Sequence, residues 1–340
     1  MNKLKVALVL FASVFTLVWG AQVAQSQEKA ATGTVDTHMV ITDQAVRDNS
    51  ELAILRPESI QVKLGKDLAK VKALIPARGE NAALQLFILI DDTCDASIGN
   101  NLNDLKDFIG AQPASTVVGV AYMSNATIQI VQNFTADHAL AVKSIRLPRG
   151  TLSSMDSPYL SLISLVQGWP EQNVRREVLM ITDGIDRLRN RNDREVSTPV
   201  SSRGRTPSSF SSNATTMPSM SLDADRASTT SQRYKVIVHS IYATGVGRLG
   251  RNSWEAQLGQ SGIAKIADET GGEYFALGTQ NLISFKPYLD RLQQIFENQY
   301  FLVFPATPRK KAGLQRVRIT TDVANAEIAA ADNAWVPAAQ

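Results

Sequence analysis

The sequence predicts an α/β fold with a mainly parallel sheet and helices on both of its faces. Residues 84–90 and 177–182 carry apolar runs of the kind found in parallel strands that are buried on both sides. Each run stops abruptly at acidic and hydroxyl residues, in Asp91-Asp92-Thr93 and in Thr182-Asp183-Gly184. From residue 84 onward such strands alternate with helical patterns, as they do in open parallel sheets.

The predicted elements of this central domain, residues 84–298, follow one another without an internal repeat. In order, we expect strands at 84–90, 115–122, 127–131, 177–182, 234–242 and 273–276, and helices near 100–111, 136–145, 158–167, 254–269 and 283–297. The strands are runs of aliphatic and β-branched residues between turn residues. The last helix carries Tyr288, Leu292 and Phe296 at helical spacing, which indicates a face packed in the core.

Segments on both sides of the central domain are also predicted to form strands. Residues 30–83 show a short alternating pattern, with Ile60 and Val62 among polar residues, which is typical of half-buried strands. After Asn298 the helical patterns stop, and residues 299–340 contain strand-like runs separated by turn residues. We expect these two β segments to pair with each other and to flank the central domain.

An insertion rich in Ser, Thr, Arg, Asn and Pro interrupts the central domain at residues 187–233. It has few large apolar residues, so it cannot bury enough surface to fold on its own, and we expect it to be unstructured. A lid that faces a ligand is the alternative, because the insertion leaves the sheet directly after Asp183.

The N-terminal residues 1–25 have the pattern of a secretory signal peptide. Lys3 and Lys5 precede an apolar run at 6–19, and small residues follow it. The run is shorter than the ~20 residues that a spanning helix needs, so we expect cleavage rather than an uncleaved membrane anchor. The mature chain is then expected to be secreted or periplasmic, with no transmembrane span.

Charge and cysteine content narrow the classes of partner. The chain has 35 Lys and Arg residues against 32 Asp and Glu residues, and loss of Lys3 and Lys5 lowers its formal charge from +3 to +1. A nearly neutral chain gives no electrostatic reason to expect nucleic acid binding. Cys94 is the single cysteine, so no internal disulfide is expected.

Residues at the strand ends are candidates for a metal site. The five candidates are Asp91, Thr93, Asp95, Thr151 and Asp183. Because the carboxyl ends of parallel strands share one edge of the sheet, their oxygen atoms can meet there. Such oxygen ligands suit a divalent cation, namely Mg²⁺, Mn²⁺ or Ca²⁺. The alternative is that Asp91 and Asp183 only cap their loops.

This arrangement resembles a von Willebrand factor type A domain, which has a Rossmann-like fold. The metal-ion-dependent adhesion site of that family uses an Asp-x-Ser-x-Ser loop, a Thr from a second loop and an Asp from a third. Asp91-x-Thr93-x-Asp95, Thr151 and Asp183 stand at the matching positions. The resemblance implies that a divalent cation bridges to a protein partner. Asp95 departs from the family's serine, so the cation would have less need of an acidic group from that partner.

Segments near the end of the chain resemble a bacterial, largely acidobacterial family of exported proteins related to these domains. The residues that carry this resemblance are 270–275, Thr-Gly-Gly-Glu-Tyr-Phe, 298–302, Asn-Gln-Tyr-Phe-Leu, and 334–337, Ala-Trp-Val-Pro. The resemblance implies export and no settled activity.

Motifs typical of enzymes are absent or lack their context. Residues 245–250 fit the Gly-x-Gly-x-x-Gly dinucleotide fingerprint. However, the strand before them, 234–242, comes late in the domain, and the next predicted helix begins only after the motif, near residue 254. His38, His138 and His239 lack zinc-site spacing, and His239 is expected to be a core residue. No Gly-x-Ser-x-Gly elbow occurs, and acidic neighbours disfavour a Cys94 thiolate.

The sequence therefore predicts an exported module that binds another protein, in adhesion or assembly, and that is not an enzyme. The partner is not identified by the sequence. A metal-free structural or assembly module of the cell envelope is the main alternative, and a hydrolase with an undetected site is a third.

Overall fold

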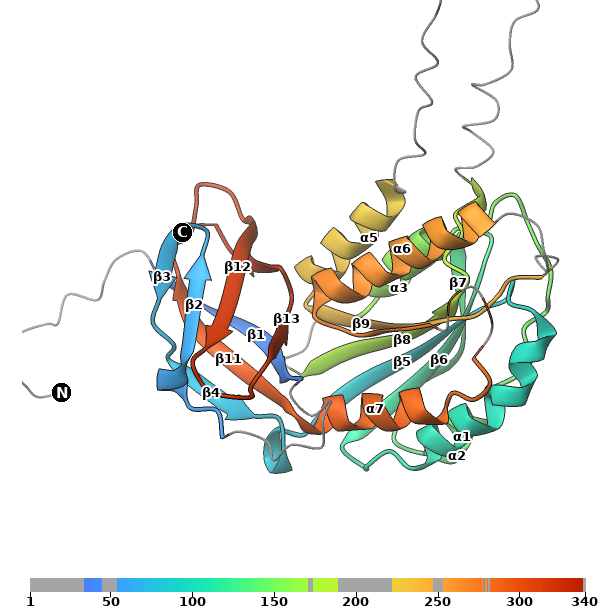
Figure 1. Cartoon of the computed structure of the whole chain (residues 1–340), viewed down its shortest axis with the longest axis horizontal. Coiled ribbons are helices and arrows are strands. Elements are labelled where there is room, and N and C mark those ends of the chain that lie inside the picture. Colours follow the sequence, from blue (N-terminus) through green and yellow to red (C-terminus); the bar gives the residue numbers. More distant parts are fainter. Residues whose placement is uncertain are drawn as a thin grey trace, which may run out of the picture. The chain divides into compact units, whose positions relative to one another are not determined.

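The computed structural model describes residues 34–44, 54–170, 174–188, 222–246, 253–276, 278, 280 and 282–338. The predicted signal peptide, residues 1–25, and residues 189–221 of the predicted insertion lie outside these ranges. Figure 1 shows a central α/β domain and a set of strands that both ends of the described chain contribute.

A sheet of six strands forms the α/β domain, in the order β10-β9-β8-β5-β6-β7. The strands are β5 (Leu84–Asp91), β6 (Thr116–Ser124), β7 (Thr127–Thr135), β8 (Arg175–Thr182), β9 (Val236–Tyr242) and β10 (Tyr274–Phe275). β5 pairs in parallel with β6 and β8, β8 pairs in parallel with β9, and β7 runs antiparallel to β6. The prediction of a mainly parallel sheet is confirmed.

Helices cover both faces of this sheet, as predicted (Figure 1). One face carries α1 (Leu102–Gly110), α2 (His138–Lys143) and α7 (Lys286–Glu297), and the other carries α3 (Pro158–Gln167), α5 (Leu222–Arg233) and α6 (Ser253–Thr270). Each face has its own apolar cluster between sheet and helices. Leu289, Leu292 and Phe296 of α7 are buried in one of them, so the predicted core face of that helix is confirmed. Among the helices within the described ranges, none combines the length and the hydropathy that crossing a membrane requires.

The prediction that residues 187–233 are unstructured is wrong for α5. Ala224, Ala227, Ser228 and Ser231 are spaced along one face of this helix and are buried, and the helix contacts α3 and α6. Small residues let helices approach closely although each one buries little apolar area. A prediction based on the content of large apolar residues therefore overlooks this helix.

Strand β7 is longer than the predicted strand at 127–131, because its last residues are anchored by aromatic packing. The ring centroid of Phe134 lies 4.5 Å from that of Phe87 and 5.2 Å from that of Trp169. Rings at these separations attract one another beyond the area that they bury. This contact between segments distant in the sequence holds residues 132–135 in the strand, beyond the predicted end at residue 131.

The two flanking β segments pair with each other in two sheets of four strands, as predicted. The first sheet has the order β13-β1-β11-β4, with β1 (Val35–Asp43), β4 (Ala73–Pro76), β11 (Gln299–Ala306) and β13 (Ile328–Ala330). The second sheet has the order β14-β12-β2-β3, with β2 (Ile60–Leu64), β3 (Asp67–Ala69), β12 (Gly313–Thr321) and β14 (Asn333–Val336). Short 3-10 turns lie at η2 (Pro57–Ser59), η3 (Gly79–Asn81) and η4 (Ala96–Asn101). Met39 and Leu302, paired across β1 and β11, share one apolar cluster with Val62 of the second sheet.

Two buried polar side chains of the central sheet make hydrogen bonds within the core. His239 is fully buried, its Nε2 lies 2.7 Å from Oε2 of Glu177, and its Nδ1 accepts from the Glu273 N–H. The prediction that His239 is a core residue is therefore confirmed. Arg175, at the start of β8, donates to the carbonyl oxygens of Phe296 and Ala82 at 2.7 and 2.6 Å.

Candidate functional site

The first loop, residues 92–97, begins where β5 delivers a buried carboxylate to the edge of the sheet. Oδ1 of Asp91 accepts from the Thr93 N–H at 2.9 Å, and Oδ2 accepts from Oγ1 of Thr182 at 2.6 Å. Thr182 is the last residue of the neighbouring strand β8. The Asp91 carboxylate thus joins the ends of two parallel strands.

The third loop, residues 183–187, follows β8 and holds a second buried carboxylate. Oδ1 of Asp183 accepts from the Ile185 N–H at 2.9 Å, and Oδ2 accepts from Nη2 of Arg187 at 2.5 Å. The Asp183 side chain is 0% exposed and that of Arg187 is 11% exposed, so this is a buried ion pair. Gly184, with a φ of +69°, permits the tight turn that brings Arg187 back onto Asp183.

The two carboxylates lie close enough to influence each other. Burial, and after it the negative charge of Asp183, raise the pKa of Asp91 to about 6, while the positive charge of Arg187 opposes the shift. Burial and the charges of Asp91 and Asp183 also raise the pKa of the Cys94 thiol, which agrees with the expectation that its thiolate is disfavoured. The structure therefore brings Asp91 and Asp183 together.

A fourth loop, residues 243–246, lies against this pair of acids. The Val246 N–H donates to the Thr93 carbonyl at 2.9 Å, and the Asp95 N–H donates to the Thr244 carbonyl at 2.8 Å. A Cβ atom on Gly245 would lie 2.2 Å from Oδ2 of Asp183, which is too close for any side chain. Gly245, which the sequence offered as part of a nucleotide fingerprint, instead permits close approach to Asp183. Residues 247–250 of that fingerprint lie outside the described residues.

The three remaining candidates are placed differently from one another. The Thr93 side chain is buried, and its Oγ1 has no hydrogen-bond partner within the described part of the chain. Asp95 caps η4, because its Oδ1 accepts from the Ser97 N–H at 2.9 Å, and hydrogen bonding to Ser97 lowers its pKa. Thr151 is exposed, in a second loop of residues 145–157. A Cβ on Gly150 of that loop would lie 3.2 Å from Cγ2 of Val246.

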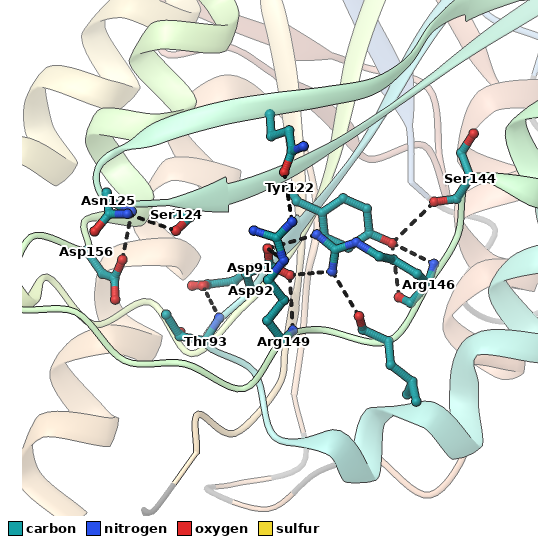
Figure 2. A network of polar contacts seen from close by, with 12 residues as sticks. Asp91, Asp92, Thr93, Tyr122, Ser124, Asn125, Ser144, Arg146, Arg149 and Asp156 are labelled. Carbon is teal, nitrogen blue, oxygen red and sulfur yellow. Dashed lines mark hydrogen bonds and ion pairs between the residues drawn. The ribbon is translucent and has the colours of Figure 1, made fainter.

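Asp92 belongs to a clamp that the sequence analysis missed, shown in Figure 2. Its Oδ1 and Oδ2 accept from Nη1 and Nη2 of Arg146 at 2.6 and 2.9 Å. The guanidinium carbon of Arg146 lies 3.6 Å from the centroid of the Tyr122 ring, and the Tyr122 hydroxyl accepts from the Arg146 N–H. The Gly150 N–H donates to the Asp92 carbonyl at 2.9 Å. These contacts, which we call the Asp92 clamp, fix the second loop against the first.

The donor set does not fit a divalent cation as the side chains are arranged. Both oxygens of Asp91 and both of Asp183 already accept hydrogen bonds, and the Arg187 guanidinium provides a positive charge. Within the described ranges, no group of three or more His, Cys, Asp or Glu side chains is placed to hold a metal ion. A bound Mg²⁺, Mn²⁺ or Ca²⁺ remains a prediction from the sequence.

The second loop presents apolar side chains to solvent. Leu147, Leu152 and Met155 are 52%, 51% and 47% exposed. The side chain of Arg149, in the same loop, is 57% exposed. We call these four exposed residues of one loop the second-loop surface. The three exposed apolar residues lie within nine consecutive residues of one clamped loop.

No protein-family model and no curated protein matches the chain. Many solved structures match the chain, among them the following three. An aerotolerance-related membrane protein from Bacteroides fragilis, carrying multiple mutations to serine, is 14% identical with a TM-score of 0.40, and the match covers 63% of this chain and 98% of that chain. The SpRpn10 VWA domain is 12% identical with a TM-score of 0.33 over 62% of this chain and 95% of that chain. A von Willebrand factor type A structure from Catenulispora acidiphila is 11% identical with a TM-score of 0.38, and the match covers 91% of this chain and 74% of that chain.

Two of these three structures are von Willebrand factor type A structures by name, and the sequence resembles the same family. At these identities the likeness is one of fold alone. No ligand, metal or partner is carried over to this chain from those structures.

Proposed function

We propose that this chain is a protein-binding module, without enzymatic activity, whose contact surface is the second-loop surface. The exposure of Leu147, Leu152 and Met155 in one loop is the observation that carries the proposal. Interface cores are enriched in apolar residues, Met and Arg, and Arg149 supplies the charged member of this set. The resemblance of the sequence to von Willebrand factor type A domains implies the same function.

Rigidity of the second loop supports the proposal. Two side-chain hydrogen bonds join Arg146 to Asp92, and the Gly150 N–H donates to the carbonyl of the same Asp92. A loop that is already held in one conformation loses less entropy when a partner binds. The clamp therefore supports the use of these exposed side chains as a preformed contact surface.

Capture of a partner tests this proposal. The native chain, the Leu152→Ser/Met155→Ser variant and a Leu68→Ser control are each immobilised and exposed to an extract of the source organism. Leu68 is 79% exposed on β3, away from the second loop in sequence. We expect one protein to be enriched on the native chain and the control and lost from the loop variant. Equal capture by all three would contradict the proposal.

Where the chain binds its partner, and whether binding needs a divalent cation, are tested separately. We propose that binding occurs outside the cytoplasm, which the signal-like pattern of residues 1–25 supports. N-terminal sequencing of the protein recovered from periplasm or medium should find a start within residues 21–27, whereas recovery of an intact Met1 from the cytoplasm would oppose it. Addition of EDTA to the capture experiment shows whether binding needs a divalent cation.

A further inference from the structure

We infer that Arg187 is the resident cation of the site, and that it takes the place which a divalent cation holds in the adhesion site that the sequence resembles. The inference stands apart from the protein-binding proposal, because it is tested with a metal ion and without a partner. It concerns the charge balance of Asp91 and Asp183.

The position of Arg187 is fixed from three directions. Its Nη2 donates to Oδ2 of Asp183 at 2.5 Å, its Nη1 donates to the Ile185 carbonyl at 3.3 Å, and its main-chain N–H donates to the Asp156 carbonyl at 2.9 Å. With 11% of its side chain exposed, the guanidinium is a built part of the site rather than a surface group.

The charge of Arg187 acts on both buried acids: it is paired directly with Asp183 and offsets part of the cost of charging Asp91. Burial works to lower the pKa of Arg187, but the charges of Asp183 and Asp91, with Asp156 further on, raise it overall. A buried carboxylate needs a compensating charge or hydrogen bonds, and a metal ion or an arginine can supply the charge. Arg187 therefore supplies to Asp183 the compensating charge that a divalent cation would otherwise supply.

The fourth loop closes one side of the ion pair between Arg187 and Asp183. The Cβ position on Gly245 is 2.2 Å from Oδ2 of Asp183 and 3.0 Å from Nη2 of Arg187, so backbone packs directly on the ion pair. A metal ion would have to displace the guanidinium from Asp183. Binding of a metal and the ion pair with Arg187 are therefore mutually exclusive.

Removal of Arg187 should uncover an oxygen-rich position. Asp183 would lose the guanidinium that donates to its Oδ2, Asp91 lies within electrostatic reach, and Oγ1 of Thr93 is buried with no hydrogen-bond partner in the described residues. Carboxylate and hydroxyl oxygens are the ligands that Mn²⁺ and Mg²⁺ prefer. The native chain should thus be indifferent to these ions, and a variant without the guanidinium should bind them.

Calorimetric titration with Mn²⁺ after EDTA treatment and dialysis tests the inference. The native chain, Arg187→Lys, which keeps the charge, and Arg226→Ala, which removes an exposed arginine, should show no binding. Arg187→Ala should give a saturable Mn²⁺ binding isotherm that the native chain lacks. Arg187→Gln keeps more of the side-chain volume and replaces the alanine variant if that one does not fold. Arg187→Ala/Asp183→Asn should lose the gained affinity.

Two results would overturn the inference. One is Mn²⁺ binding by the native chain that disappears in Asp183→Asn, since the ion would then coexist with Arg187. The other is a folded Arg187→Ala or Arg187→Gln variant, checked by circular dichroism, that binds Mn²⁺ no better than the native chain.

Discussion

At the scale of single residues, the site depends on a carboxyl group that titrates in an unusual range. Asp91 is 3% exposed, and its two oxygens accept hydrogen bonds from Thr93 and Thr182. Burial first, and the charge of Asp183 second, raise its pKa from 3.8 to about 6. The charge of Asp91 therefore changes within the range of ordinary buffers, and the stability of the fold should follow it.

The raised pKa predicts that Asp91 costs stability as the pH rises. A carboxyl group whose folded pKa lies above its unfolded value contributes most below the unfolded value of 3.8, and the contribution is lost as the pH passes through about 6. Over that window the loss is as much as about 3 kcal/mol. Asp91→Asn removes the titrating group. Between about pH 4 and pH 7.5, the free energy of unfolding of the variant in urea should therefore rise relative to that of the native chain. The prediction would be contradicted if the free energies of unfolding of the variant and the native chain differed by the same amount at about pH 4 and at about pH 7.5.

Gly245→Ala tests the close packing of the fourth loop. A Cβ atom would lie 2.2 Å from Oδ2 of Asp183, so either the loop or the ion pair has to move. We expect a loss of about 1–3 kcal/mol in the free energy of unfolding, the usual cost of overpacking. Gly110→Ala is the matched control, since nothing lies within 4 Å of its Cβ position and helix α1 includes it. Equal stability of the two variants would count against the described contact.

At the scale of elements, the Asp92 clamp decides how the second loop lies on the sheet. Asp92→Asn leaves Arg146 without its carboxylate, and we expect a loss of about 2 kcal/mol in urea unfolding, because charge-assisted hydrogen bonds of a buried acid are lost. Asp36→Asn removes an exposed ion pair with Lys72 and should cost under about 1 kcal/mol. If both substitutions cost the same, the clamp is no stronger than a surface pair.

The elements that the sequence predicted are those whose signal is local. The apolar runs of β5 and β8 are continuous because both of their faces are buried, and their abrupt ends marked Asp91 and Asp183 directly. Helix α5 was missed because its buried face consists of small residues. The sequence analysis placed Arg187 in the insertion because it relied on composition, which is averaged over many residues. The ion pair between Arg187 and Asp183 depends instead on a single turn at Gly184, which composition does not detect. The spacing of four residues between Arg187 and Asp183 was the one local sign.

At the scale of the whole molecule, the two ends of the described chain form one pair of sheets. Strand β11 lies between β1 and β4, and its Leu302 is buried in the same cluster as Met39 and Val62. The pairing of these segments was predictable from their matching patterns. The order of the strands was not, because alternation reports which face of a strand is buried and not which strand lies beside it.

Truncation tests this dependence. A chain that ends at Asn298 lacks β11, β12, β13 and β14, so β1 and β4 lose their shared neighbour. The apolar cluster around Met39 and Ile41 is then exposed. We expect the truncated chain to bind a hydrophobic dye and to unfold without a cooperative transition that includes residues 34–76. A cooperative transition with the stability of the complete chain would show that the central domain does not depend on these strands.

A double-mutant cycle between Arg187 and Asp183, measured by urea unfolding in EDTA, tests the central claim most directly. Each of Arg187→Gln and Asp183→Asn removes one charge of this buried ion pair, which typically costs about 3–5 kcal/mol. If Arg187 is the cation that compensates Asp183, the double variant should be less destabilised than the sum of the single variants by about 2 kcal/mol or more. Additivity within about 0.5 kcal/mol would contradict the account, because the two charges would then not depend on each other.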